Sequence, residues 1–107
     1  MQQVTSDEDF DQLVSDADKG LVIIDCYADW CGPCKRLAPQ LDEYSSTFAE
    51  EEKVNFYKLN IEDLADTTSK LEIQSMPTIL FYKNAVYQGR FTGADFEGIK
   101  KIIDTFL

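Results

Sequence analysis

A chain of 107 residues is long enough for one domain with a single hydrophobic core, and its 44% hydrophobic and 28% charged residues argue against a disordered protein. Twenty acidic residues against ten basic ones give a net charge of -10, which repels phosphate groups and argues against nucleic acid or an anionic membrane as a partner. Because no basic N-terminal region precedes an apolar run, and no apolar run reaches the roughly 18 residues of a membrane span, we expect a cytoplasmic protein.

The first predicted element is an amphipathic helix over residues 6–19. Ser6 and Asp9 resemble a capping box at its start, and Gly20 is a stop signal after its end. Apolar residues with helical spacing are Phe10, Leu13, Val14 and Ala17. The next segment, LVIIDCYA at 21–28, is a short run without polar alternation, which predicts a central strand covered on both faces.

The segment ADWCGPCKRLAP at 28–39 places Cys31 and Cys34 around a Gly-Pro pair. After Cys34, apolar residues recur with helical spacing at Leu37, Leu41, Tyr44 and Phe48. The two cysteines therefore lie at a strand-to-helix junction, with Cys31 near the N-terminus of the helix.

The second half of the chain predicts three more strands. VNFYKLNI at 54–61 is typical of a second central strand, and residues 78–83 and 87–93 are predicted to form an antiparallel hairpin across 84–86. Helical spacing also predicts a short helix at Leu64, Thr68 and Leu71 and a terminal helix at Phe96, Ile99, Ile103 and Phe106. This order indicates an α/β fold with a mixed sheet between helices.

The cysteine count limits what Cys31 and Cys34 can form. Three cysteines without a secretory signal do not make a framework of structural disulfides. A tetrahedral zinc site needs four Cys or His ligands, but the chain has no histidine and its third thiol, Cys26, lies in an apolar run, so we expect no metal. A Cys-x-x-Cys pair beside a βαβ pattern instead indicates a redox-active dithiol.

Four features in register make the chain resemble the thioredoxin family over its whole length. They are WCGPCK at 30–35, Asp25 six residues before Cys31, MPT at 76–78 and Gly93 before the last helix. The resemblance implies a single thioredoxin domain over residues 1–107, with a central five-stranded mixed β-sheet flanked by four α-helices. It also implies a cis peptide before Pro77 and the reduction of disulfides in other proteins.

The resemblance implies partners as well. A flavin-containing, NADPH-dependent thioredoxin reductase would recycle the oxidised form, so NADPH and FAD act through that partner and the chain itself binds no cofactor. The implied substrates are disulfide-containing proteins such as peroxiredoxins, ribonucleotide reductase and methionine sulfoxide reductase. We expect a monomer that binds neither nucleic acid nor membrane.

Cys31 is the expected nucleophile and Cys34 the resolving thiol. The N-terminal turn of a helix stabilises a thiolate at Cys31, whereas Cys34, one turn further in, is expected to be more buried. Pro33 stiffens the loop, and Gly32 gives a substrate chain close access. In the family, Gly-Pro between the cysteines goes with reductants and Gly-His with isomerases. The alternative for the pair is two inert thiols at a helix start.

Asp25 is the second informative residue, because a carboxylate in an apolar central strand is costly to bury. Burial should raise its pKa, which suits an acceptor for the Cys34 proton. Lys58 matches the family's lysine near this aspartate. The alternatives are an exposed strand carboxylate at Asp25 and a solvent-facing charge at Lys58.

Four further residues are expected to shape the site. Trp30 would wall one side of the dithiol, the alternative being an ordinary core aromatic. A cis Pro77 would leave the Met76 backbone free to pair with an extended substrate, the alternative being a plain strand-start proline. Gly93 is either a turn glycine or a source of room for substrates.

Two positions depart from the family pattern. Cys26 stands where many relatives carry a bulky aromatic, and we interpret it as a small buried residue on the strand face opposite to Asp25. Ala85 follows Asn84 in the predicted turn, although alanine tolerates a positive φ poorly.

Three classes of function remain open from the sequence: a general protein-disulfide reductase, an oxidase or isomerase of the same fold, and a binding module in which the dithiol is incidental. The Gly-Pro pair and the absent secretory signal favour the reductase.

Overall fold

Five strands form one sheet in the computed structural model, which describes all 107 residues. The order across the sheet is β1 (Gln2–Gln3), β3 (Val54–Asn60), β2 (Leu21–Tyr27), β4 (Thr78–Lys83) and β5 (Val86–Thr92). Both β1 and β2 run parallel to β3, whereas β4 is antiparallel to β2 and β5 is antiparallel to β4.

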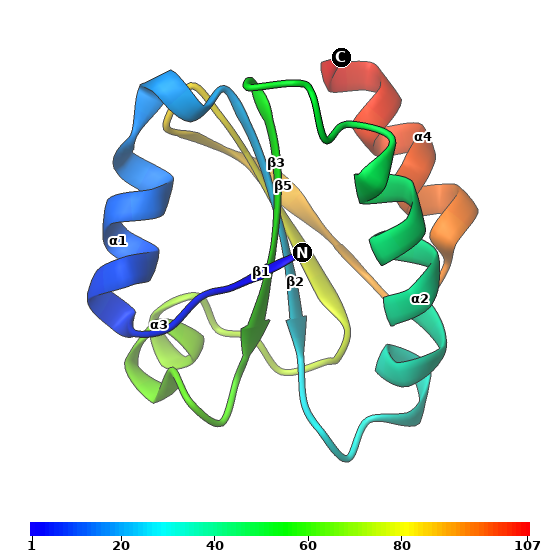
Figure 1. Cartoon of the computed structure of the whole chain (residues 1–107). Coiled ribbons are helices and arrows are strands. Elements are labelled where there is room, and N and C mark those ends of the chain that lie inside the picture. The colour runs from blue at the N-terminus through cyan, green and yellow to red at the C-terminus, as the bar shows by residue number, and fades with distance from the viewer.

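The helices lie in two layers, one on each side of the sheet (Figure 1). One layer contains α1 (Asp7–Ser15) and α3 (Ala65–Lys70), and the other contains α2 (Gly32–Ser46) and α4 (Phe96–Phe106). The expected five-stranded mixed sheet flanked by four helices is therefore confirmed. None of these helices is both long enough and apolar enough to cross a membrane.

The sheet separates two hydrophobic cores, and β2 contributes to both. Successive side chains of a strand point to opposite faces, so Val22 and Ile24 pack toward α1 and α3 while Leu21 and Ile23 pack toward α2 and α4. Because both faces of β2 are buried, its sequence is a continuous apolar run, as expected for a central strand.

The predicted helix over 6–19 is in fact two helices. Ser6 does cap α1, with its hydroxyl accepting the Asp9 N–H at 3.0 Å. Asp16 then takes an extended conformation, and its carboxylate accepts the Asp18 N–H at 3.0 Å, which starts a short 3-10 helix over Ala17–Lys19. The apolar spacing did not reveal this break, because an aspartate can cap a new turn as readily as it can continue a helix.

Gly20 follows at a φ of 69°, a conformation that favours glycine. A Cβ atom there would lie 2.7 Å from the Lys53 carbonyl oxygen, so the close approach of the two chain segments also requires glycine.

Two strand predictions were less accurate than the rest. The residues gave no sign of β1, a pair of glutamines that aligns with Tyr57 and Lys58 of β3. The hairpin turn consists of Asn84 and Ala85 alone, at φ values of 52° and 67°, so β5 begins at Val86 rather than at residue 87. A two-residue turn with two positive φ angles matches the twist of the strands and is the commonest hairpin connection.

Candidate active site

A short loop leads from the carboxyl end of β2 into α2 (Figure 1). The cysteine pair lies at the end of this loop, where α2 begins. Cys31 is the N-cap of α2, and Pro33 stands in the first helical turn, where a missing N–H costs nothing. Cys31 and Cys34 form a disulfide with a Cα–Cα distance of 5.3 Å. The expected strand-to-helix junction and the pairing of the two cysteines are thus confirmed.

The backbone of α2 points at the Cys31 sulfur. The Cys34 N–H donates to Cys31 Sγ at 3.1 Å, and both cysteines are nearly buried, with 5% and 3% of their surface exposed. A helix N-terminus has unpaired N–H groups and the positive end of the helix dipole. After reduction, a negative charge on Cys31 Sγ would be stabilised by these groups.

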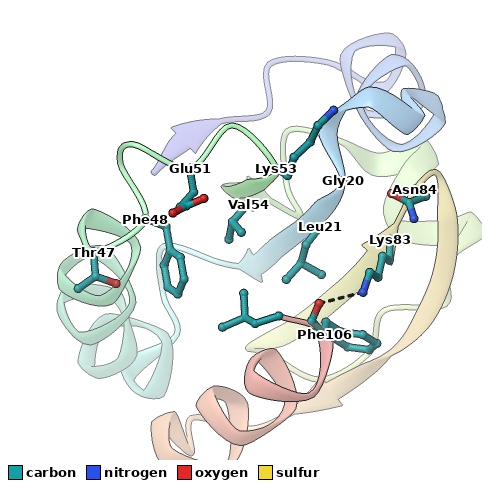
Figure 2. A pocket seen from close by; sticks show the side chains of 11 residues that line it. Gly20, Leu21, Thr47, Phe48, Glu51, Lys53, Val54, Lys83, Asn84 and Phe106 are labelled. Carbon is teal, nitrogen blue, oxygen red and sulfur yellow. Dashed lines mark hydrogen bonds between the residues drawn. The ribbon is translucent and has the colours of Figure 1, made fainter.

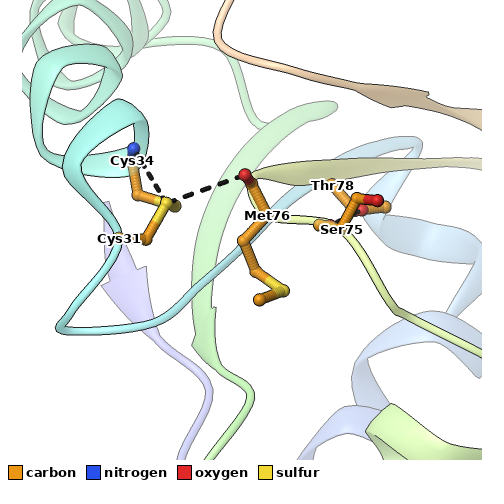
Figure 3. The surroundings of a disulfide bond; sticks show 5 residues. All are labelled: Cys31, Cys34, Ser75, Met76 and Thr78. Carbon is orange, nitrogen blue, oxygen red and sulfur yellow. Dashed lines mark hydrogen bonds between the residues drawn. A yellow bond between two sulfur atoms is a disulfide. The ribbon is translucent and has the colours of Figure 1, made fainter.

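The start of β4 faces the disulfide from the other side. The Met76–Pro77 peptide is cis, and the Met76 carbonyl oxygen lies 3.7 Å from Cys31 Sγ (Figure 3). Neither the N–H nor the C=O of Met76 is used in a backbone hydrogen bond. The Gly93 N–H donates to the Pro77 carbonyl at 2.9 Å, so Met76, Pro77 and Gly93 come together beside Cys31.

Gly93 has a φ of 109°, and no atom lies within 4 Å of where its Cβ would stand. Gly93 is thus a glycine in a conformation that favours glycine, and it also leaves open space beside the strand that begins after Pro77.

Trp30 is not a core aromatic, because 66% of its surface is exposed. The partly buried side chains that pack against the cluster of Ala28 and the two cysteines are Tyr27, Ile61 and Met76. Tyr27 and Ile61 were missed from the sequence, although each stands at or just beyond the carboxyl end of a parallel strand, where side chains commonly line a site.

Asp25 is buried, with 3% of its surface exposed, and its Oδ1 atom has no hydrogen-bond partner. The alternative of an exposed strand carboxylate is therefore wrong. Asp25 and Cys34 line the same cavity of about 290 Å³, which also includes Lys58 and Asp42. Such a volume is sufficient for water, through which a proton can pass between the two groups.

Burial raises the pKa of Asp25 from 3.8 to about 7, and the negative charge of Asp42 adds to this effect. Lys58 acts in the opposite direction, since its positive charge lowers the pKa of Asp25. The Asp25 carboxyl therefore exchanges its proton near neutral pH, which a carboxyl in water does not.

Lys58 is paired with Asp25 across the parallel register of β2 and β3, and it is half-buried at the cavity. The alternative prediction for Lys58, a charge that only faces solvent, is therefore wrong.

Cys26, the neighbour of Asp25 on β2, faces the opposite core. Its side chain is fully buried among residues that pack toward α1 and α3, and it is a free thiol. Burial raises the pKa of the Cys26 thiol well above its ordinary value, so the prediction of a small buried residue away from the dithiol is confirmed.

A larger cavity, of about 670 Å³, lies at the opposite end of the sheet, where β2 and β3 begin (Figure 2). Leu21, Val54 and Phe48 project toward it, and Lys83 Nζ donates to the backbone carbonyl of Phe106 at 2.9 Å. It contains no thiol, so it is not part of the redox site. No group of three or more acidic, cysteine or histidine side chains in the chain is arranged to hold a metal ion.

Comparisons with known proteins agree on one family. The family model described as Thioredoxin matches residues 1–105. Thioredoxin-2 of Saccharomyces cerevisiae is 37% identical over 101 residues, which cover 94% of this chain and 93% of the yeast protein.

Two solved structures have nearly the same fold. A thioredoxin of Plasmodium falciparum has a TM-score of 0.89 and 37% identity, with both chains fully covered. A yeast structure that concerns the thiol resolving mechanism of a mitochondrial 1-Cys peroxiredoxin via glutathione/thioredoxin systems has a TM-score of 0.87 and 27% identity, covering 98% of this chain and 94% of the other.

Proposed function

Because this chain belongs to the thioredoxin family and is a thiol-disulfide oxidoreductase that reduces disulfides, we propose a specific role for each residue of its site. Cys31 is the nucleophile, Cys34 is the resolving thiol and Asp25 accepts the Cys34 proton. The observation that carries this proposal is the position of Cys34, which is bonded to Cys31 at the helix terminus and lines the same cavity as Asp25.

The first step is attack by the Cys31 thiolate on one sulfur of a substrate disulfide. A bond forms between Cys31 Sγ and that sulfur, the substrate S–S bond breaks, and the other substrate sulfur leaves as a thiolate. The Cys34 N–H that lies 3.1 Å from Cys31 Sγ favours the charged nucleophile.

The second step releases the substrate. Cys34 gives its proton to Asp25 and attacks Cys31 Sγ, so the Cys31–Cys34 bond forms while the mixed disulfide breaks. The departing substrate thiolate takes up a proton, and two electrons have passed from the dithiol to the substrate. Asp25 is suited to this step because a base is most effective when its pKa is near the working pH.

The surrounding residues receive the substrate. The unpaired backbone of Met76, held by Pro77, pairs with an extended substrate segment, and Gly93 leaves room beside it. Trp30 forms an exposed wall near Cys31. Gly32 and Pro33 keep the connection between the thiols short, and Lys58 moderates the proton affinity of Asp25.

We further propose that the chain acts as one domain over residues 1–107 and as a cytoplasmic monomer, binding no cofactor of its own. A flavin-containing thioredoxin reductase returns the disulfide to the dithiol with electrons from NADPH. Substrates are disulfide-containing proteins, among them peroxiredoxins, for which the yeast structure named above is a precedent, ribonucleotide reductase and methionine sulfoxide reductase.

Insulin reduction, coupled to NADPH and a thioredoxin reductase, tests the proposal. We expect NADPH consumption that depends on this protein and is lost in Cys31→Ser. A protein that binds insulin without turnover would be a binding module, and one that reactivates scrambled ribonuclease better than it reduces insulin would be an isomerase.

A further inference from the structure

Asp42 is a second carboxylate at the Asp25 cavity, and no pattern in the sequence predicts it there. It lies on α2, two turns after Cys34, and Cys34, Ala38 and Asp42 are spaced by four residues on one face of the helix. All three line the cavity of about 290 Å³ that contains Asp25. Half of the Asp42 side chain is exposed, so the cavity connects a buried carboxyl to one at the surface.

We propose that Asp42 is a positioning residue for disulfide exchange, whose negative charge opposes ionisation of Asp25 and so strengthens Asp25 as an acceptor of the Cys34 proton. This inference rests on the acceptor role proposed for Asp25. Asp42 itself touches no reacting sulfur, and it takes part in no bond that forms or breaks.

The arrangement of charges around Asp25 supports this role. Its Oδ1 atom receives no hydrogen bond that would stabilise the carboxylate, so burial and then nearby charges decide how readily it ionises. Two negative charges at one cavity repel each other, and the protein wall screens them less than water does. Asp42 is the largest electrostatic contribution that favours the protonated form of Asp25, and burial is the only larger effect.

Other groups at the cavity oppose Asp42 or add to it. Lys58 on β3 and Lys35 on α2 are cationic, whereas Asp29 is acidic and precedes α2; the remaining titratable groups there are Tyr27 and Cys34. The N-terminal amino group of Met1 lies 3.2 Å from Asp42 Oδ1 and offsets part of its charge. Since half of the Asp42 side chain is in solvent, the remaining effect is moderate and decreases with salt.

Without the Asp42 charge, Asp25 loses its proton at a lower pH and becomes a weaker base. The resolving step in which Cys34 is deprotonated should therefore reach half of its maximal rate at a lower pH, and its maximal rate should decrease.

The test compares Asp42→Asn with Glu43→Gln, which removes the same charge from the next residue of α2, where the side chain lines a different surface hollow. Carboxyl NMR of the reduced protein follows the Asp25 titration at low salt, and single-turnover release of a mixed disulfide gives the rate of resolution against pH. We expect Asp42→Asn to lower both midpoints by about 0.5 pH unit or more, and Glu43→Gln and Asp42→Glu to leave them near wild type.

Two outcomes would overturn the proposal: an Asp25 midpoint in Asp42→Asn equal to that of wild type, or an equal shift in Glu43→Gln. The double variant Asp25→Asn/Asp42→Asn should resolve mixed disulfides with the same pH dependence as Asp25→Asn alone, because Asp42 acts through Asp25. If Asp25→Asn leaves resolution unchanged, the acceptor role of Asp25 fails. If Asp25→Asn slows resolution while Asp42→Asn has no effect, only the inference about Asp42 fails.

Discussion

Replacing Asp25 by asparagine should separate stability from activity. The pKa of Asp25 is about 7 in the folded protein against an ordinary value of 3.8, a difference of about 3 pH units. At about 1.36 kcal/mol per unit, ionisation of this one buried group lowers the free energy of unfolding by about 4 kcal/mol. Asp25→Asn removes that cost but buries an amide without a partner, which costs about 1–3 kcal/mol.

The effect should depend on pH in a defined direction. A carboxyl with a raised folded pKa keeps its proton in the folded state while the unfolded chain has lost it, so the stability of wild type relative to the variant decreases from pH 4 to pH 7 and is constant above. At pH 8 we expect Asp25→Asn to be more stable than wild type by about 1–3 kcal/mol, and near pH 4, where the ionisation cost is absent, the variant should be the less stable protein. Urea denaturation of both proteins in the same redox state, at pH 4, 6 and 8, measures this difference.

The same variant tests the proton-acceptor role. Insulin turnover should fall, because Cys34 loses its base, whereas iodoacetamide alkylation of Cys31 should remain fast, since the helix terminus and not Asp25 stabilises that thiolate. A stability difference that does not vary between pH 4 and pH 8 would refute the burial argument. A destabilised variant with unchanged turnover would show that Asp25 is only a structural residue.

Three further predictions concern the cysteines and the hairpin turn. Cys34→Ser should accumulate mixed disulfides with proteins of a cell extract, because Cys31 still attacks and nothing resolves the adduct; non-reducing gels with no more adducts than Cys31→Ser would reverse the assignment of the two thiols. Mild oxidation should form a single disulfide, Cys31–Cys34, and leave Cys26 unlabelled until the protein unfolds, which mass mapping after alkylation would show; labelling of Cys26 as fast as Cys31 in the native protein would contradict its burial. Ala85→Gly should raise the free energy of unfolding by about 0.5–1 kcal/mol, because alanine at a φ of 67° is strained; equal urea midpoints at equal slope would show that the turn tolerates alanine without cost.

The central part of the fold was predictable because burial restricts which residue types can occupy a position. The uniform apolar character of β2 marked a strand covered on both faces, and the single carboxylate within it marked the site. The helical spacing after Cys34 placed Cys31 at a helix terminus, which the structure confirms. In each case the packing environment allowed few other residue types.

The residues that the sequence did not predict have structural roles that many side chains could fill. The glutamines of β1 pair through their backbone, so their side chains carry no strand signal. Asp16 separates α1 from the 3-10 helix, and its carboxylate caps the second of these. Because this aspartate is exposed, its hydrogen bond leaves no trace in the spacing of apolar residues. Asp42 looks like one more charge on a helix surface, and only the four-residue spacing from Cys34 through Ala38 connects it to the site.

Alternate side chains of β2 face two different cores. The side chain that reaches the site therefore depends on the number of residues in the strand. Asp25 and Cys26 are adjacent in sequence, yet the sheet lies between their side chains. Deletion or insertion of one residue early in β2 would exchange their faces and bring a third thiol next to Cys34, where it would compete for the mixed disulfide. The number of residues in β2, and not only their apolar character, therefore decides whether a carboxylate or a thiol faces Cys34.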